Sequence, residues 1–144
     1  MIRACTLFTD GSAWTGDRIG AHAWIRLTEG EKDVLGGGSE EDTTISRQEL
    51  LGPVEGLADI WDEFGPCEVL IRSDSEYVCL GAMNRSRKRN KNQDLWECLD
   101  LLMDSHLGVR FEHVKGHNGD YHNEIVDEYA GELRKERQVE KKDR

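Results

Sequence analysis

The sequence predicts an α/β or α+β fold in which helices cover a central sheet. Apolar, β-permissive segments come first along the chain, and later ones alternate with segments whose apolar residues recur every three or four positions. This order indicates one sheet flanked by helices. A length of 144 residues suits a single domain. We expect that domain over residues 1–137, followed by a charged tail at residues 138–144.

The strands are predicted from apolar runs that are bounded by turn signals. The first run ends at Asp10-Gly11-Ser12, and a later one ends at Asp74. Residues 28–31 contain the glycine expected of a hairpin loop. The five predicted strands are residues 2–9, 21–27, 32–39, 67–73 and 109–114.

The helices are predicted from the three-to-four residue period and from their capping residues. The longest starts at Ser46, which with Glu49 fits a capping box, and ends near Gly65. Pro53 lies inside this helix, where a proline usually causes a kink. Three more helices are predicted: a short one that follows Asp74-Ser75-Glu76-Tyr77 and runs to about Met83, one around residues 95–103, and one from about His122 to Arg137, after which we expect a frayed tail.

Composition excludes several classes of protein. With 37% apolar and 33% charged residues the chain reads as soluble and globular, and it has no long apolar run or leader. We therefore expect a cytoplasmic protein without membrane contact. The cysteines show no metal-like spacing, so buried free thiols are favoured. They are Cys5, Cys67, Cys79 and Cys98.

A formal net charge of −10 argues, taken alone, against a nucleic-acid partner. Five basic residues are nevertheless clustered between Arg85 and Lys91, inside residues 84–93, which contain no apolar side chain. We call residues 84–93 the basic arm. Local potential guides a polyanion more than total charge does, so this segment could serve a phosphate backbone or be a solvated loop.

Four acidic residues occupy positions where a sheet protein gathers ligands. Asp10 and Asp74 follow buried strands, and ligands bind at the carboxyl ends of strands in open sheets. Glu49 and Asp127 lie near the starts of two helices. Taken one by one, they could be a turn residue, two helix caps and a solvated charge. Taken together, they suit a hard cation, Mg²⁺ above all, with Mn²⁺ as a substitute.

Five motifs in order resemble those of the type 1 ribonucleases H. They span Thr9 to Ala130 and are TDGS (9–12), SRQEL (46–50), SDSEYV (73–78), NQDLW (92–96) and HVKGHNGDYHNEIVDEYA (113–130). The resemblance implies a ribonuclease H-like α/β fold, with a central mixed five-stranded sheet flanked by helices.

The same resemblance implies an activity and its residues. The expected enzyme is an endonuclease that hydrolyses the RNA strand of RNA:DNA hybrids by a two-metal-ion mechanism, leaving 5′-phosphate and 3′-hydroxyl ends. Asp10, Glu49, Asp74 and Asp127 would be catalytic and hold two Mg²⁺ ions. His117 would shuttle protons or help product release, and Glu124 would support the metal site.

Substrate contacts are also implied. Two groups are expected to touch the hybrid: Gly11, Ser12, Thr44, Ser46, Arg47 and Gln48 beside the metal site, and Arg85, Arg87, Lys88 and Arg89 in the basic arm. Ser46 departs from the asparagine that relatives often carry. The arm is shorter than the handle of many relatives, so we expect weaker and more salt-sensitive binding. We expect His22, His106, His113 and His122 to be structural or solvated.

Two alternatives stay open. Another nuclease of the same fold, such as a junction resolvase or an integrase-like enzyme, could use the same acidic cluster. A non-catalytic hybrid-binding module is the other, although such a module is expected to have lost carboxylates. A monomer is the expected state of the protein.

Overall fold

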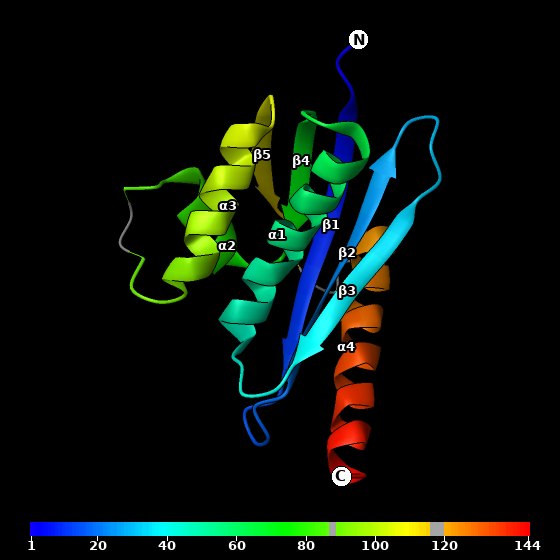
Figure 1. Cartoon of the computed structure of the whole chain (residues 1–144), viewed down its shortest axis with the longest axis vertical. Helices are drawn as coiled ribbons and strands as arrows, with labels where there is room; N and C mark the ends of the chain where they lie inside the picture. Colours follow the sequence, from blue (N-terminus) through cyan, green and yellow to red (C-terminus); the bar gives the residue numbers. More distant parts are fainter. Residues whose placement is uncertain (87–88, 116–119) are drawn as a thin grey trace.

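Five strands form one mixed sheet in the order β3-β2-β1-β4-β5 (Figure 1). The computed structural model describes residues 1–86, 89–115 and 120–144. β1 (Ala4–Ala13), β2 (Gly20–Thr28) and β3 (Val34–Glu40) are antiparallel neighbours. β4 (Glu68–Ser73) runs parallel to β1, and β5 (Gly108–His113) runs parallel to β4. The predicted mixed five-stranded sheet is confirmed.

The helices cover the two faces of this sheet unequally (Figure 1). α1 (Ile45–Phe64), α2 (Glu76–Met83) and α3 (Gln93–Ser105) share the larger apolar core with the inner side chains of β1 and β4. α4 (Tyr121–Lys142) packs on the opposite face, against the antiparallel half of the sheet. In the described ranges, no helix is both long enough and apolar enough to cross a membrane.

β1 is longer than the sequence indicated. The expected turn at Asp10 is wrong, because β2 continues to pair with β1 as far as Ala13, opposite Gly20. The pairing between β1 and β4 stops earlier, at Thr9 and Ser73. Asp10 therefore lies inside a strand, yet at the carboxyl edge of the parallel pair.

The start of α1 also differs from the prediction. Thr44 is the N-cap, and its side chain accepts a hydrogen bond of 3.2 Å from the Arg47 amide. The capping box expected at Ser46 is wrong, because Ser46 is already inside the helix. Pro53 lies within α1, which is assigned as one helix from Ile45 to Phe64.

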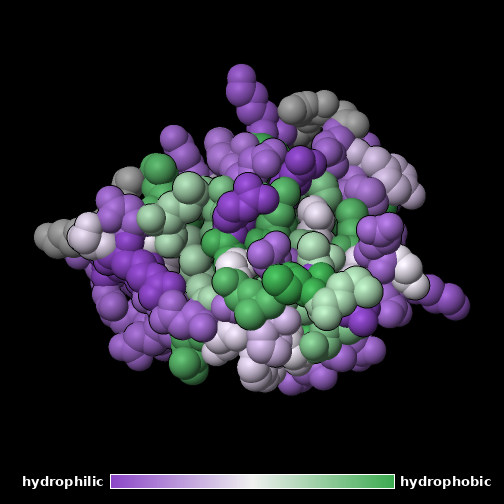
Figure 2. All heavy atoms as spheres, turned by 90° about the horizontal axis from the view of Figure 1, so that it is seen from above, coloured by the Kyte–Doolittle hydropathy of each residue, from purple (hydrophilic) through white to green (hydrophobic). Residues whose placement is uncertain are grey.

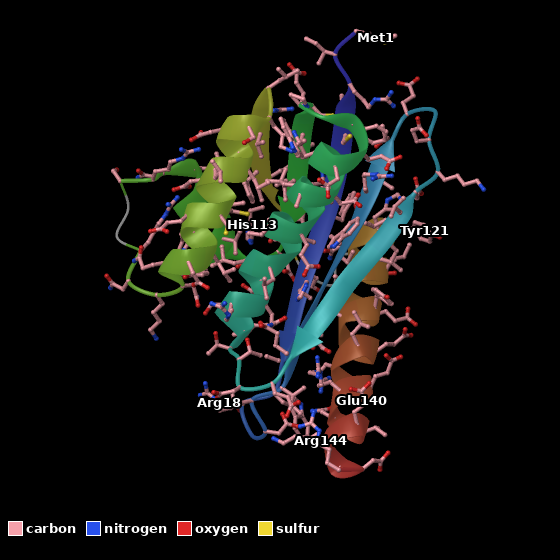
Figure 3. All side chains as sticks on the ribbon, in the orientation of Figure 1. Met1, Arg18, His113, Tyr121, Glu140 and Arg144 are labelled. Carbon is pink, nitrogen blue, oxygen red and sulfur yellow. The ribbon has the colours of Figure 1, made fainter. Side chains whose placement is uncertain are left out.

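The chain end is ordered as helix rather than frayed. α4 continues to Lys142, and contacts with the loops at the carboxyl edge hold its last turns. Gln138 Nε2 donates to Asp17 Oδ2 at 2.7 Å, and Arg144 Nη1 donates to Glu41 Oε1 at 2.9 Å. Arg144 and Glu140 are labelled at this end in Figure 3.

The cysteine prediction is confirmed in part. All four thiols are free, and those of Cys5, Cys67 and Cys79 are buried, but Cys98 is exposed on α3.

Figure 2 shows the end of the molecule where β1 begins, with apolar side chains gathered near the centre of the view and hydrophilic ones around them. Met1 and Ile2 are among the exposed apolar residues of the chain.

Candidate functional site

Asp10 is a buried carboxylate, with 6% of its surface exposed, at the carboxyl edge of β1. Its Oδ1 accepts a hydrogen bond of 2.8 Å from the amide of Gly11. Burial, with further contributions from Asp74 and Asp127, raises the pKa of Asp10 to about 9. The surroundings of Asp10 therefore favour the neutral, protonated form of its carboxyl group.

Asp74 is the first residue after β4 and lies next to Asp10, whose pKa it raises by charge repulsion. Ser75, rather than Asp74, caps α2, because its side chain accepts from the Val78 amide at 3.2 Å. The reading of Asp74 as a helix cap is therefore wrong. The backbone carbonyl of Asp74 lies 3.1 Å from His113 Nε2, a contact that joins β5 to the residue. His113 thus has a structural role here.

Glu49 reaches the same edge from α1. A Cβ atom on Gly11 would lie 2.8 Å from the Glu49 amide nitrogen, so the absence of a side chain lets α1 press against β1 at this point. Burial raises the pKa of Glu49, a hydrogen bond with Ser75 lowers it, and the charge of Asp74 raises it. Glu49 and Asp74 are therefore neighbours.

Asp127 comes to Asp10 from the other face of the sheet. It lies in the second turn of α4, and its side chain is exposed. A hydrogen bond between the two carboxyl groups helps to raise the pKa of Asp10. Glu124 lies one turn earlier on α4 and is exposed, so the helix presents both acids near its beginning.

The four carboxylates converge without a neutralising partner. Within the described part of the chain, no Lys, Arg or His forms an ion pair with Asp10, Glu49, Asp74 or Asp127. Across the same residues, no three His, Cys, Asp or Glu side chains form a group that could hold an ion as they stand. Like charges repel, and Mg²⁺ usually binds one or two carboxylates together with water and substrate phosphate. An all-oxygen donor set of this kind fits that cation.

The residues expected to touch a substrate beside these acids differ in their exposure and in their side-chain partners. Gly11, Ser12, Thr44 and Ser46 are each partly or fully exposed. Gln48 is fully buried, and its amide hydrogen-bonds His22, Glu40 and Thr43. Arg47 makes a two-pronged contact with Asp94, at 3.1 and 2.8 Å. The side chains of Gln48 and Arg47 are thus engaged within the protein.

The arginines of the basic arm that the structure describes are also engaged. Arg85 donates to both carboxylate oxygens of Asp104, at 3.1 and 2.8 Å. Arg89 donates to Asp100 and to the carbonyl of Gly81, and it lies over the Trp96 ring at 4.3 Å. Trp96 is 1% exposed and belongs to the larger apolar core. The predictions for Arg87, Lys88 and His117 fall outside the described residues.

Two contributors to the site were missed by sequence reasoning. Ser75 holds Glu49, and its position directly after Asp74 is a signal of helix capping that could have revealed it. Arg134 of α4 donates to Ser12 Oγ at 2.9 Å, and nothing in the local sequence pattern indicates this contact between residues so far apart. Ser75 thus holds one of the four carboxylates, and Arg134 holds a residue close to Asp10 in β1.

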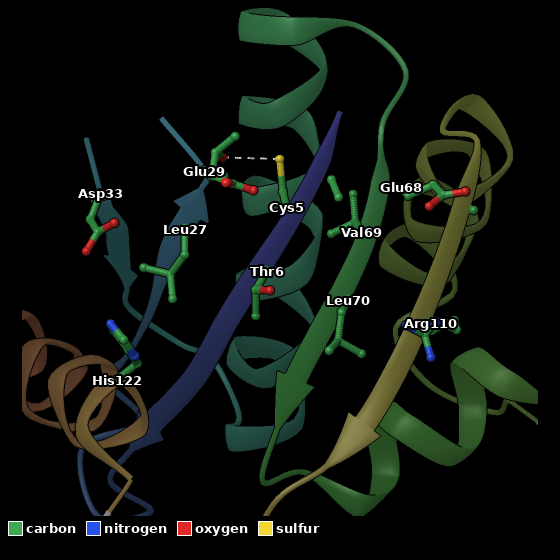
Figure 4. Close-up of a pocket in the computed structure, with 13 residues that line it drawn as sticks. Cys5, Thr6, Leu27, Glu29, Asp33, Glu68, Val69, Leu70, Arg110 and His122 are labelled. Carbon is green, nitrogen blue, oxygen red and sulfur yellow. Dashed lines mark hydrogen bonds between the residues drawn. The ribbon is translucent and has the colours of Figure 1, made fainter. Parts of the chain in front are cut away.

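A wide groove lies away from these acids (Figure 4). It has a volume of about 750 Å³ and lies on the same side of the sheet as α4, over Thr6, Leu27 and Leu70, with His122 of α4 at its border. None of the four carboxylates lines it. The candidate site is therefore an open edge of the sheet rather than this groove.

Comparison with known proteins finds one family model and several relatives that match most of the chain. The family model described as RNase H matches residues 3–135. Ribonuclease H of Pseudomonas fluorescens is 37% identical over 142 residues, which cover 90% of this chain and 89% of that protein. Ribonuclease H of Thermus thermophilus is 39% identical over 137 residues, covering 86% and 80%.

Solved structures agree on the fold. RNase H1 of the archaeon Halobacterium salinarum superposes with a TM-score of 0.76 at 19% identity, covering 90% of this chain and 96% of that one. The N-terminal RNase H domain of a Mycobacterium tuberculosis protein gives a TM-score of 0.80 at 17% identity, covering 92% and 94%.

Proposed function

Because the chain belongs to the RNase H family, we propose that it hydrolyses the RNA strand of RNA:DNA hybrids at the edge where Asp10, Glu49, Asp74 and Asp127 meet. Its activity is that of its family, a ribonuclease H endonuclease. The observation that carries the assignment of the site is the convergence of four carboxylates from four elements, with which no Lys, Arg or His of the described residues forms an ion pair.

Members of this family are typically metal-dependent, and the proposed cofactor is Mg²⁺, with Mn²⁺ as a substitute. Two bound ions would neutralise charge on the attacking and leaving oxygens and lower the pKa of the attacking water, which gives 5′-phosphate and 3′-hydroxyl ends. Oxygen ligands without sulfur support a hard cation. The raised pKa of Asp10 supports it too, because burial and the neighbouring acids disfavour the charge of this group, and a bound cation would favour it.

The chain's own residues would position this chemistry. The Gly11 amide orients Asp10, Ser75 orients Glu49, and the His113 contact fixes the backbone that carries Asp74. Asp127 approaches from α4 and completes the ring of acids, with Glu124 one turn away as a supporting acid. His117 keeps its proposed role in proton transfer or product release.

Hybrid binding would rest on a small set of contacts. Gly11, Ser12, Thr44 and Ser46 are accessible beside the acids and suit contacts to 2′-hydroxyls across the minor groove. Arg47, Arg85 and Arg89 already have carboxylate partners, so Arg87 and Lys88 are the arm residues proposed to meet the phosphates. We therefore expect weak binding that depends strongly on salt. A monomer and a cytoplasmic location stay predictions.

A substrate panel tests the proposal. A labelled RNA:DNA hybrid is incubated with the protein beside duplex DNA, duplex RNA and a four-way junction, each with Mg²⁺, Mn²⁺ or EDTA. Metal-dependent cutting of the hybrid's RNA strand alone is the expected result. Cutting of the junction instead would favour a resolvase, and hybrid binding without cutting would favour a non-catalytic module.

A further inference from the structure

His22 is a buried histidine of β2 whose two ring nitrogens both face oxygen atoms. It is 2% exposed. Its Nδ1 lies 2.7 Å from Gln48 Oε1, and its Nε2 lies 2.8 Å from Glu55 Oε2. Both partners belong to α1, so the ring connects β2 to that helix.

The orientation of the Gln48 amide identifies the proton donors. Gln48 Nε2 donates to Glu40 Oε1 and to Thr43 Oγ1, both at 2.8 Å. Gln48 Oε1 is thus the atom that faces His22, and an amide oxygen can only accept. Glu55 Oε2 lies at ion-pair distance from Nε2, although the direction of this contact is poor for a hydrogen bond. With an accepting oxygen at Nδ1 and a carboxylate beside Nε2, the ring fits both neighbours when each nitrogen carries a hydrogen, which makes His22 an imidazolium.

The charged groups around His22 agree with this state. Glu55 faces it from α1 and Glu40 from β3, while Arg47 Nε lies 3.7 Å from Glu40 on the far side. Burial lowers the pKa of His22, but its contacts with Glu55 and Gln48 and the charges of Glu55 and Glu40 outweigh that effect, so its pKa is raised. Burial raises the pKa of Glu55, and the contact with His22 outweighs that effect, so its pKa is lowered.

His106 shows that burial alone does not produce this state. It is 6% exposed and also contacts α1, at the other end of the helix. Its Nδ1 accepts from the Cys67 amide at 3.1 Å, and its Nε2 lies 3.0 Å from the Leu57 carbonyl. One donor and one acceptor suit a neutral ring. The two buried histidines therefore differ in their partners: His22 faces two oxygen atoms, whereas His106 faces one amide donor and one carbonyl acceptor.

The position of Gln48 connects His22 to the carboxylates. Gln48 directly precedes Glu49, and the backbone of these two residues is the part of α1 that presses on Gly11. We propose that His22 is a positioning residue for hybrid cleavage: as a buried imidazolium it holds Gln48, and with it the turn of α1 that carries Glu49, against β2. This inference rests on the proposed function of Glu49.

The pH dependence follows from the sign of the shift. A histidine whose pKa is raised in the folded state stabilises the fold fully below its ordinary value of about 6.5. That stabilisation is lost as pH rises through the raised value. The turn that carries Glu49 is then held less firmly at alkaline pH.

The test compares His22→Gln with His106→Gln, since both variants remove a buried ring and share every other titrating group. At about pH 7, we expect His22→Gln to lower kcat on the hybrid by a factor of about five or more. KM should change less than about twofold. We expect His106→Gln to lower the melting temperature and leave kcat unchanged. An unchanged kcat in folded His22→Gln, beside an active wild type, overturns the inference alone, whereas an inactive wild type overturns the proposed function.

A second readout needs neither activity nor a buried substitution. The ring nitrogens of His22 are followed by NMR as pH is raised, in the wild-type chain and in Glu55→Gln. We expect a doubly protonated ring at about pH 7 in the wild type, and a titration at lower pH in Glu55→Gln. A neutral His22 ring in the wild type at that pH overturns the proposal even if His22→Gln does not fold.

Discussion

The carboxyl edge of β1 and β4 gathers acidic side chains, while the basic arm between α2 and α3 gathers basic ones. At the edge, Asp10 has two carboxyl neighbours, and its pKa is raised to about 9. In the arm, Arg85 pairs with Asp104 and Arg89 with Asp100. In the described residues, the fold pairs the arginines of the arm with carboxylates, whereas no Lys, Arg or His forms an ion pair with the acids of the edge.

This difference separates charges that hold the structure from charges that are kept for a ligand. An arginine whose fork is filled by a carboxylate contributes to the fold and has little left for a phosphate. A buried carboxylate beside other carboxylates costs stability and persists where something else, here the proposed cations, uses it. Removal of a charge at the carboxyl edge should therefore lower hybrid cleavage and raise stability in the absence of divalent cation. Removal of a paired arginine in the basic arm should lower stability and leave hybrid binding almost unaltered.

Asp10→Asn should have the largest effect. Loss of partners that only surround a metal costs about 10–100-fold in activity, so loss of a ligand should lower hybrid cleavage more than about 100-fold. Without divalent cation the same variant should be more stable than the wild type, by more than about 1 kcal/mol near neutral pH, because a shift of one unit is worth about 1.4 kcal/mol. A cleavage assay and thermal melts with EDTA measure both.

The gain in stability should depend on pH with a definite sign. The pKa of Asp10 is raised in the folded state. The stability that comes from its protonation is therefore fully present at acid pH and is lost as pH rises through about 9. The advantage of Asn should thus grow from about pH 4 upward. Asp33→Asn, a substitution of an exposed acid outside the site, is the control. A destabilised Asp10→Asn would contradict the reading of the edge.

Gly11→Ala should have the next largest effect. The added methyl would lie 2.8 Å from the Glu49 backbone nitrogen, so α1 must move away from β1. We expect a loss of about 1–3 kcal/mol of stability and at least a tenfold or so loss of cleavage, since misplacement by about 1 Å can cost 100-fold. Gly16→Ala is the matched control, because nothing lies within 4 Å of the added atom. Equal activity in the two variants would contradict the role of Gly11 in placing Glu49.

Arg89→Met should change stability and leave hybrid binding almost unaltered. Its side chain is 12% exposed and joins Asp100, the Gly81 carbonyl and the Trp96 ring. Loss of these contacts should cost about 1–3 kcal/mol of unfolding free energy. Denaturant unfolding and a salt titration of hybrid affinity separate the two roles. A stable variant with a salt slope reduced by about one would instead make Arg89 a phosphate contact.

Sequence patterns were sufficient for the order of the elements and for the approach of Asp10 to Asp74. The carboxyl-edge rule brings these two acids together, and apolar periodicity locates α1, α3 and α4. The exact ends depended on tertiary partners. β1 passes Asp10 because β2 pairs beyond it, and α4 passes Arg137 because Gln138 and Arg144 find acceptors in distant loops.

The roles of individual polar residues were harder to predict. Gln48 and Arg89 were assigned to the substrate by resemblance, but their partners come from segments that no local pattern links to them. The protonation of His22 likewise depends on Gln48 and Glu55, which lie 26 and more residues away. Side-chain contacts of this kind become visible only when the elements are packed.

The most direct test is a calorimetric titration of Mn²⁺ into the wild-type chain in two buffers with different ionisation enthalpies. Binding of a cation to the four carboxylates should release protons near neutral pH, because the raised pKa keeps Asp10 protonated until the ion arrives. The account predicts binding with proton release in the wild type and in Asp33→Asn, and loss of both in Asp10→Asn. Binding that releases no protons, or that survives in Asp10→Asn, would contradict it.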